Sequence, residues 1–275
     1  MKQELVKNTL REAYENPQTV ARYSGKQGLW RSEELLIKRY FPRSGDILDL
    51  GCGAGRTSIP LTLMGFHVVG MDLSFPLLKA ARLETDTHGL KPDFLQMDAM
   101  DLAFADESFA GAIFSINEMD YMHGYEGKLE VLDQVFRVLR PGAPLIFSGH
   151  RICSPVHLGT LIWGGLKLYL GKILGFSTLE EEWGELYNLK AITPEERYSH
   201  FMSSRRWASA IRTARFDLIY HESRSHLGCT RLRRRIRRSL SIWNFALFVA
   251  RNPERLRELI IMNAMRPNCD VKLRR

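Results

Sequence analysis

The sequence predicts an α/β fold with a doubly wound, mostly parallel sheet, and three observations support this. Short apolar runs alternate with amphipathic helical stretches between residues 46 and 150. The first of these runs breaks directly into a glycine-rich turn that opens a helix. The chain has 275 residues, of which 45% are hydrophobic, so it can build one large core. This composition excludes a disordered chain and a disulfide-stabilised miniprotein.

The N-terminal segment is predicted to form two helices that precede the sheet. Residues 1–15 and 30–41 show helical spacing of apolar side chains, and Pro42 ends the second helix. The segment between them, NPQTVARYSGKQG at 16–28, is expected to be a loop. We treat residues 1–44 together as an N-terminal helical cap.

The core of the sheet is predicted over residues 45–150. Residues 47–50 form the first strand, residues 51–55 form the turn, and a helix follows as far as Met64. The alternation then repeats, with strands at 66–72, 93–98, 109–115 and 144–148 and helices at 76–83 and 129–139. Sheets of this type bind ligands at the carboxyl ends of their strands, which is where we expect the site.

Beyond residue 150 the alternation stops and resumes only near Ser203. Residues 151–203 are therefore predicted to be an insertion that forms a helical lid or substrate-binding element. Residues 204–250 are expected to complete the sheet, with a helix at 204–214, strands at 216–222 and 242–250, and a basic loop between these strands. Residues 251–275 are expected to form a C-terminal helix and tail.

Cysteine usage and the N-terminus favour a cytoplasmic protein. The four cysteines form no CxxC pair, and the first ten residues lack the basic and then apolar pattern of a signal peptide. No run reaches the ~18 apolar residues that a membrane-spanning helix requires. The longest uncharged stretch, residues 152–166, is interrupted by His157 and stopped by Lys167. Peripheral attachment to a membrane remains open.

Charge is distributed unevenly along the chain. Residues 201–275 contain 18 basic and 5 acidic residues, a net charge of +13, whereas residues 1–200 contain 21 and 26, a net charge of −5. Part of this excess is a basic cluster in the loop before the last strand, formed by Arg231, Arg233, Arg234, Arg235, Arg237 and Arg238. Such a cluster is either a solvated surface or a site for a phosphate group, an anionic membrane surface or RNA.

The glycine-rich turn at residues 51–55 carries the first chemical signal. Gly51, Gly53 and Gly55 leave bare backbone at a strand end, and the following helix offers free N–H groups, so a ligand can lie against the chain. The dinucleotide fingerprint GxGxxG would require a glycine where Arg56 stands. This spacing argues against a nicotinamide cofactor.

The segment ILDLGCGAGR, residues 47–56, resembles the first motif of the class I S-adenosylmethionine-dependent methyltransferases. Further positions follow in the family's order, with Asp72 after the second strand, Met97-Asp98-Ala99 after the third, residues 106–109 before the fourth and residues 138–142 before the fifth. The resemblance covers about residues 30–150, with weaker agreement over 204–250. It implies a Rossmann-like sheet of seven strands, the last of them antiparallel.

The resemblance also implies a binding site for S-adenosylmethionine. It assigns cofactor binding to Gly51, Gly53, Asp72 and Asp98, supported by Asp49, Gly55, Ala99 and Ser115. In this assignment Asp72 accepts the ribose hydroxyls, Asp98 accepts the exocyclic amine of adenine, and the backbone N–H of Ala99 meets a ring nitrogen. Asp49 is expected to orient the turn rather than to act as a catalyst. Taken singly, these positions also fit a tight turn, a strand end and a helix cap.

The acceptor of the methyl group is less well defined by the sequence. Because a methyl sulfonium is already activated, the enzyme needs mainly in-line positioning of the acceptor, plus a base where the acceptor is protonated. His150, after the fifth strand, is the candidate base or else a structural polar residue. Residues 115–118 are SINE, and not the Asn/Asp-Pro-Pro-aromatic element of enzymes that methylate base amines. No cysteine nucleophile in a Pro-Cys or Thr-Cys setting and no metal site can be assigned.

The insertion favours a small or lipid-like acceptor. Residues 157–176 are apolar except for Lys167 and Lys172 and a few polar side chains. Aromatic residues occur throughout this region and just beyond it, namely Trp163, Tyr169, Phe176, Trp183, Tyr187, Tyr198, Phe201 and Trp207. The segment is expected to roof a pocket over the cofactor, to pack as a helical subdomain, or to dip into a membrane surface. By resemblance, the loop with Tyr23, Ser24 and Trp30 is also expected to fold over the cofactor.

The predicted function is transfer of a methyl group from S-adenosylmethionine to an O, N or C atom of a small apolar or aromatic metabolite or lipid-like acceptor. Two alternatives remain at this stage. One is an RNA methyltransferase that uses the basic loop. The other is a catalytically inactive, cofactor-binding interaction module.

Overall fold

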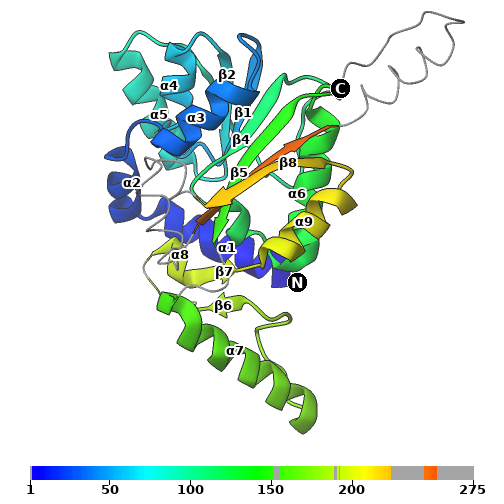
Figure 1. Ribbon diagram of the computed structural model, residues 1–275. Helices are drawn as coiled ribbons and strands as arrows, with labels where there is room; N and C mark the ends of the chain where they lie inside the picture. Colours follow the sequence, from blue (N-terminus) through cyan, green and yellow to red (C-terminus); the bar gives the residue numbers. More distant parts are fainter. Residues whose placement is uncertain (1, 151–154, 189–190, 192, 224–244, 253–275) are drawn as a thin grey trace, which may run out of the picture.

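The computed structural model describes residues 2–150, 155–188, 191, 193–223 and 245–252 (Figure 1). Its centre is a seven-stranded sheet in the order β3-β2-β1-β4-β5-β9-β8. The strands are β1 Asp46–Leu50, β2 His67–Asp72, β3 Asp93–Gln96, β4 Gly111–Phe114, β5 Pro144–His150, β8 Asp217–Ser223 and β9 Phe245–Arg251. The first five strands are parallel, and β9 is antiparallel to both of its neighbours. The expected doubly wound sheet with an antiparallel last strand is confirmed.

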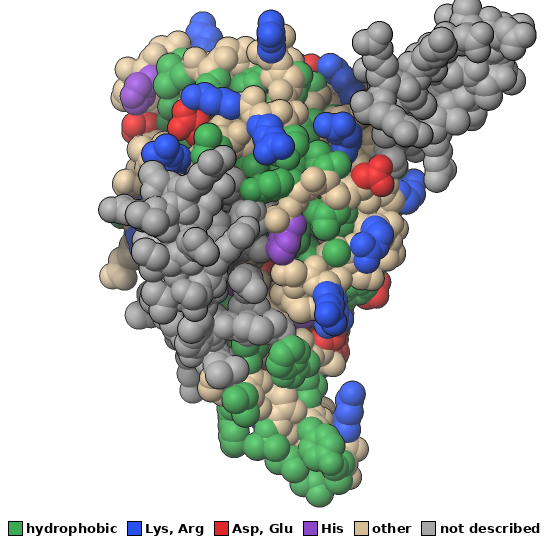
Figure 2. Space-filling view, in the orientation of Figure 1, with side chains coloured by type: hydrophobic (Ala, Val, Ile, Leu, Met, Phe, Trp, Pro, Cys, Tyr) green, Lys and Arg blue, Asp and Glu red, His purple; other side chains and the backbone are tan. Residues whose placement is uncertain are grey.

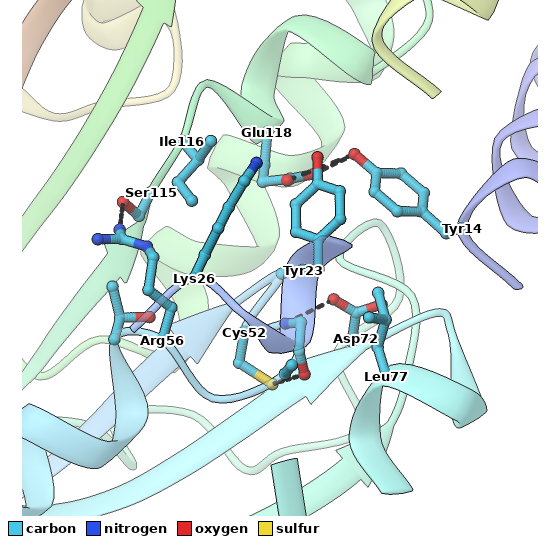
Figure 3. A pocket seen from close by; sticks show the side chains of 14 residues that line it. Tyr14, Tyr23, Lys26, Cys52, Arg56, Asp72, Leu77, Ser115, Ile116 and Glu118 are labelled. Atoms are coloured by element: carbon cyan, nitrogen blue, oxygen red, sulfur yellow. Dashed lines mark hydrogen bonds between the residues drawn. The ribbon is translucent and has the colours of Figure 1, made fainter. Parts of the chain in front are cut away.

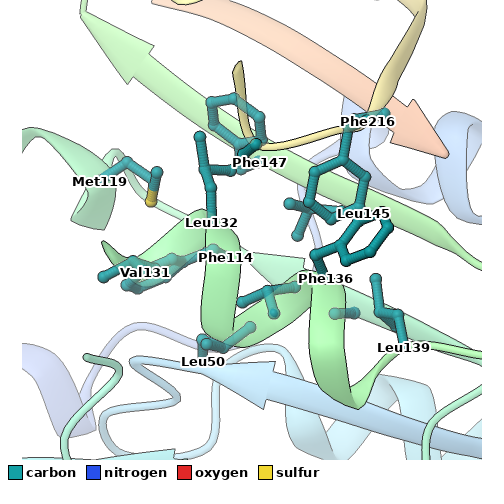
Figure 4. Packing of buried hydrophobic residues seen from close by; sticks show 14 of the residues in the cluster. Leu50, Phe114, Met119, Val131, Leu132, Phe136, Leu139, Leu145, Phe147 and Phe216 are labelled. Atoms are coloured by element: carbon teal, nitrogen blue, oxygen red, sulfur yellow. The ribbon is translucent and has the colours of Figure 1, made fainter. Parts of the chain in front are cut away.

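Helices cover both faces of the sheet (Figure 1). Those of the core are α3 Arg31–Tyr40, α4 Ser58–Leu63, α5 Phe75–Thr87, α6 Gly124–Val138 and α9 Ser204–Thr213. Because successive side chains of a strand point to opposite faces, β1 contributes side chains to the hydrophobic layers on both faces of the sheet. Ile47 packs with α3 and α4, whereas Leu48 and Leu50 pack with α6 and α9. The second of these layers is the larger core, in which α6 lays one apolar stripe against β4 and β5 (Figure 4).

Local sequence explains where the helices that flank the site begin. Ser74 caps α5 by accepting the backbone N–H of Leu77, and Pro76 occupies the second helical position. This capped start places α5 directly after Asp72, at the carboxyl end of β2. The short 3-10 helix η1, Glu118–Tyr121, follows β4. Asp72 and Glu118 therefore both lie at the edge formed by the carboxyl ends of the parallel strands.

The expected loop at residues 16–28 is wrong, because most of it is the helix α2, Pro17–Ser24. Asn16 caps this helix by accepting the N–H of Gln18, and Pro17 stands at its first position, where the missing N–H costs nothing. Thr19 and Tyr23, four residues apart, form its buried face. The Asn-Pro pair that opens the expected loop is instead the start signal of a helix.

The described part of the 151–203 insertion contains α7 Pro155–Leu174, β6 Glu185–Tyr187, α8 Pro194–Arg197 and β7 Tyr198–His200. β6 and β7 form a separate antiparallel pair. The N-terminal helix α1, Lys2–Glu15, lies against α8, since Arg197 donates to the carbonyl of Thr9. In Figure 1, α7 extends away from the body of the protein.

Two expectations fall outside the described residues. These are the basic cluster at Arg231 to Arg238 and the C-terminal helix and tail beyond residue 252. Within the described part of the chain, no helix combines the length and apolar character needed to cross a membrane.

Candidate functional site

Two adjoining clefts lie at the carboxyl ends of β1, β2 and β4 and form one continuous site. The first, of about 410 Å³, is lined by Tyr14, Tyr23, Lys26, Gly51, Cys52, Gly53, Ala54, Arg56, Thr57, Asp72, Leu77, Ser115, Ile116 and Glu118 (Figure 3). The second, of about 510 Å³, is lined by Leu10, Tyr14, Gly51, Met71, Asp72, Leu73, Met97, Asp98, Ala99, Phe114, Glu118, Tyr121 and Met122. Tyr14, Gly51, Asp72 and Glu118 border both.

The three predicted glycines have different roles. Gly51 (φ +60°) has no room for a side chain, because an added Cβ would lie 3.0 Å from both Phe114 and Glu118. Gly53 (φ +54°) faces open space, with no heavy atom within 4 Å of an added Cβ. Gly55 (φ +84°) instead packs against Ala81 and lines neither cleft. Gly51 and Gly53 therefore expose bare backbone to a ligand, and Gly55 supports the turn.

Asp72 is fixed at the centre of the site by backbone groups. Its Oδ2 accepts the N–H of Gly53 at 2.9 Å, and its Oδ1 accepts the N–H of Ser74 at 2.8 Å. Burial raises the pKa of this carboxyl to about 6, although the backbone donors oppose the rise. Each carboxylate oxygen can accept more than one hydrogen bond, so Asp72 retains capacity for the hydroxyls of a ligand.

Asp98 and Ala99 border the second cleft, as expected from the sequence, but Asp98 is already engaged. Its Oδ2 lies 2.7 Å from the ammonium of Lys7 in α1, and its Oδ1 accepts the N–H of Met100. The hydrogen bond to Asp98 is the main cause that raises the pKa of Lys7. A ligand amine that binds Asp98 must therefore share this carboxylate with Lys7.

Asp49 and Ser115 support the site from the interior. Asp49 is fully buried and accepts the hydroxyls of Thr57 at 2.5 Å and Ser58 at 2.6 Å, so it ties β1 to the start of α4. Burial raises the pKa of Asp49 to about 6, against the effect of those two donors. The Ser115 hydroxyl accepts from Arg56 at 2.5 Å and donates to Glu33. The Ser115 hydroxyl is therefore already engaged in hydrogen bonds within the protein. The two hydrogen bonds that Asp49 accepts fit the role of orienting the turn that we expected for it.

Sequence reasoning did not assign Tyr14, Lys26 or Glu118 to the site, although all three line the first cleft. Tyr14 in α1 donates from its hydroxyl to the carboxylate of Glu118 at 3.4 Å, across the border of the two clefts (Figure 3). Tyr23 in α2 lines the first cleft, and the Lys26 ammonium lies 4.2 Å from the centre of its ring. The expectation that Tyr23 folds over the site agrees with this placement. Ser24 and Trp30, by contrast, line neither cleft.

His150 ends β5 and pairs with a carboxylate that the sequence did not reveal as its partner. Its Nδ1 lies 2.8 Å from Oδ2 of Asp120, which also accepts the backbone N–H of His150 at 2.6 Å. Asp120 belongs to η1 and is completely buried. His150 does not line either described cleft. The centre of its ring lies 5.0 Å from the ring centre of Phe201 in the insertion.

The aromatic residues of the expected roof differ in burial. Tyr198, Phe201 and Trp207 are buried, Tyr187 is half-buried, and Trp163, Tyr169, Phe176 and Trp183 are exposed. None of the described residues of 151–203 lines the two clefts. The apolar side chains above the site come instead from α1 and α2. The N-terminal helices therefore cover the site, whereas α7 packs on β6.

Comparison with known proteins identifies the central part of the chain. Residues 47–142 match the family model described as a methyltransferase domain. The putative methyltransferase YqeM of Bacillus subtilis is 35% identical over 115 residues, which cover 42% of this chain and 46% of that protein. A demethylmenaquinone methyltransferase of Clavibacter sepedonicus is 32% identical over 135 residues, 49% of this chain and 52% of that protein. The chain spans about half the length of these curated relatives.

Solved structures confirm the fold. A methyltransferase from Methanosarcina mazei described as SAM-dependent superposes with a TM-score of 0.59 at 23% identity, over 79% of this chain and 96% of the other. The [4+2]-cyclase SpnF superposes with a TM-score of 0.60 at 16% identity, over 89% and 95%. At these identities the likeness concerns the fold alone, and the chemistry must be argued from the site.

Proposed function

We propose that this protein, whose residues 47–142 form a class I S-adenosylmethionine-dependent methyltransferase domain, transfers a methyl group to a small apolar or aromatic, lipid-like acceptor. The observation that carries the proposal is the junction of the two clefts. There a bare glycine backbone and the carboxylate of Asp72 meet at the carboxyl ends of β1 and β2. This is the edge where doubly wound sheets bind nucleosides.

The residues present fit S-adenosylmethionine. The open space at Gly53 admits a ligand against the backbone, and the Asp72 carboxylate can accept two ribose hydroxyls. Ala99 and Met97 give the second cleft an apolar side next to Asp98, as an adenine ring requires. When bound, the cofactor supplies a methyl group on a positively charged sulfur. The protein's part is to position this group and to exclude water, for which Tyr14 and Tyr23 stand at the cleft.

The lipid-like acceptor is supported by the names of relatives. The Clavibacter sepedonicus relative is named for demethylmenaquinone, and a relative from Nitrosococcus oceani, 33% identical over 37% of this chain and 42% of its own, is named for ubiquinone biosynthesis. A quinone-like compound combines an aromatic ring with an acidic hydroxyl in its reduced form. Such a compound is therefore the first acceptor to test.

We propose His150, the candidate from the sequence, as the base that removes the acceptor's proton, although it lines neither of the two clefts. A hydrogen bond from Nδ1–H to Asp120 makes Nε2 the basic nitrogen of the ring. Asp120 receives the backbone N–H of the same residue, so it fixes both the ring and the strand end that carries it. We therefore assign Asp120 as a positioning residue and His150 as the proton acceptor.

The alternatives of RNA methylation or an inactive module rest on the basic cluster, and no observation among the described residues favours them. Calorimetric titration with S-adenosylhomocysteine, with NAD as the control ligand, tests the proposal without knowledge of the acceptor. We expect micromolar binding of the former only. Asp72→Ala should weaken it by roughly 10-fold to 150-fold, which corresponds to about 1.5–3 kcal/mol for a charged hydrogen-bonding partner. Asp86→Ala, at an exposed position of α5, is the matched control.

Two results would contradict the proposal. Binding of NAD in place of S-adenosylhomocysteine would show a different cofactor. Equal affinity of the Asp72→Ala and Asp86→Ala variants would remove Asp72 from the site. With binding established, transfer of labelled methyl groups to a reduced quinone, but not to RNA, is the expected acceptor result, and the reverse preference would favour the RNA alternative.

A further inference from the structure

The helix α7 carries a continuous apolar stripe that faces solvent. Its side chains lie at the i, i+4, i+7, i+8 spacing of one helical face, namely Ile162, Trp163, Leu166, Tyr169, Leu170, Ile173 and Leu174. Trp163, Tyr169 and Ile173 are 58%, 63% and 60% exposed. Figure 2 shows this end of the molecule as a large hydrophobic area. We call these seven residues the α7 stripe.

The opposite face of α7 explains why the stripe points outward. Leu161, Gly164 and Gly171 are its buried positions, and Gly164 lies 3.4 Å from the carbonyl of Glu185 in β6, measured from an added Cβ. The absence of a side chain at Gly164 lets the helix approach β6 closely, and Gly171 lies against Phe176 and Thr178. The packing that holds α7 in place therefore uses its narrow side and leaves the broad apolar side uncovered by the described residues.

The charges around the α7 stripe indicate which kind of partner can bind it. Residues 155–174 contain Lys167 and Lys172 and no acidic residue. Lys167 is paired with Glu180 at 3.2 Å, but Lys172 is exposed and lies one helical turn after Tyr169, outside the edge of the stripe. The nearby exposed carboxylate of Glu181 is paired with Lys2 at 3.0 Å. The face is therefore apolar and cationic, and two copies placed stripe to stripe would bring like charges together.

The kinds of side chain in the stripe match a lipid–water interface. Trp and Tyr have an apolar ring and one polar group, so they favour the headgroup region, while Ile and Leu favour the acyl chains just below it. A lysine beside such a stripe meets anionic headgroups and can extend along the surface. A projecting convex helix also suits a flat and deformable partner, since a protein partner would have to provide a matching groove.

We propose that α7 docks along the surface of an anionic lipid bilayer through the α7 stripe and Lys172. The inference goes beyond the proposed methyl transfer, because vesicle binding can be measured without turnover. It would also bring the protein to the phase in which an apolar acceptor dissolves. Membrane binding and cofactor binding are thus separate properties, and either can fail without the other.

The test is co-sedimentation of the full chain with vesicles of phosphatidylcholine alone and of phosphatidylcholine with phosphatidylglycerol. The stripe variant is Trp163→Ser with Ile173→Ser. Its matched control is Leu63→Ser with Leu83→Ser, since these two residues are 66% and 61% exposed on α4 and α5. We expect the stripe variant to partition at least about tenfold more weakly to both vesicles, because two large apolar side chains no longer enter the interface. The control should bind like the wild type.

A charge variant tests the second part of the proposal. Lys172→Glu should weaken binding to the anionic vesicles roughly fivefold or more and change binding to neutral vesicles little. Lys91→Glu, at an exposed position before β3, is the control. S-adenosylhomocysteine affinity should be the same in all variants, which shows that each still folds.

Three results would overturn the proposal. Wild-type protein that does not sediment with either vesicle would exclude docking. Binding to anionic vesicles that the stripe variant retains in full would assign it to another cationic segment, such as residues 231–238. A loss of mass in light scattering on the Trp163→Ser and Ile173→Ser change, without any lipid effect, would identify a second copy of the chain as the occupant.

Discussion

The buried ion pair between Glu33 and Arg56 should be a major contributor to the stability of the site. Arg56 donates from both terminal nitrogens to the Glu33 carboxylate at 2.8 and 3.0 Å, and also to the carbonyl of Gly28 at 2.8 Å. Its guanidinium lies 4.8 Å from the ring centre of Trp30. Both charged side chains are almost completely buried. The pair thus joins the turn after β1 to the segment that leads into α3.

Replacing Arg56 with Met keeps the length of the side chain but leaves the Glu33 carboxylate buried without its cation. Removal of one partner of such a pair costs about 3–5 kcal/mol. For a domain of this size, 1 kcal/mol corresponds to a shift of about 2–4 °C in the melting temperature, so we expect a fall of roughly 6–20 °C. Glu33→Gln should also be destabilising, while the double variant should cost less than the sum, because it removes both buried charges.

Equilibrium unfolding in urea of the four proteins in this cycle provides the measurement. Arg215→Met is the matched control, because Arg215 pairs with Asp133 at a similar 3.0 Å but both side chains are exposed. An exposed pair contributes about 0–1 kcal/mol, so this variant should change stability little. The reasoning is refuted if Arg56→Met costs no more than Arg215→Met, or if the effects of Glu33→Gln and Arg56→Met simply add.

Three further predictions concern the site and its surroundings. Because the Asp72 pKa is raised to about 6 and its charged form is the better acceptor, affinity for S-adenosylhomocysteine should fall as pH drops below about 6, and Asp72→Asn should flatten that dependence in calorimetry. Burial lowers the Lys128 pKa to about 8, so the folded state holds fewer protons than the unfolded state between about pH 8 and 10.5. The free energy of unfolding should therefore rise with pH in that range, and this rise should be absent in Lys128→Met. Gly51→Ala forces a Cβ to within 3.0 Å of Phe114 at a positive φ, so binding of S-adenosylhomocysteine should be lost or strongly weakened, whereas Gly89→Ala, which is also at positive φ but contacts nothing, should bind normally.

The sequence predicted the sheet well because its signals are local. Strands such as β4 are continuous apolar runs, and the turn at residues 51–55 has few alternatives to a strand-to-helix connection. The helix α2 was missed because an Asn-Pro pair starts both turns and helices. Only the burial of Thr19 and Tyr23 against neighbouring elements decides between the two.

Parts of the site depend on contacts between segments that are far apart in the sequence, and no sequence motif predicts these contacts. Glu118 and Tyr14 are 104 positions apart and meet only because η1 follows β4 beneath α1. The engagement of Asp98 by Lys7 and the pairing of His150 with Asp120 have the same origin. The outward direction of the α7 stripe also escaped prediction, since an apolar helix with buried glycines on one side has the same composition as a core helix.

The order of the strands means that the sheet can be completed only late in synthesis. β9, residues 245–251, occupies the position between β5 and β8, although it is the last described strand along the chain. A growing polypeptide that has not yet passed residue 251 therefore has β5 as an open sheet edge, with Leu145 and Phe147 lacking their cover from Phe248. Unpaired apolar edges of this kind recruit other chains. A ribosome that stalls before residue 245 would thus release an aggregation-prone product, although residues 47–142 have already been translated.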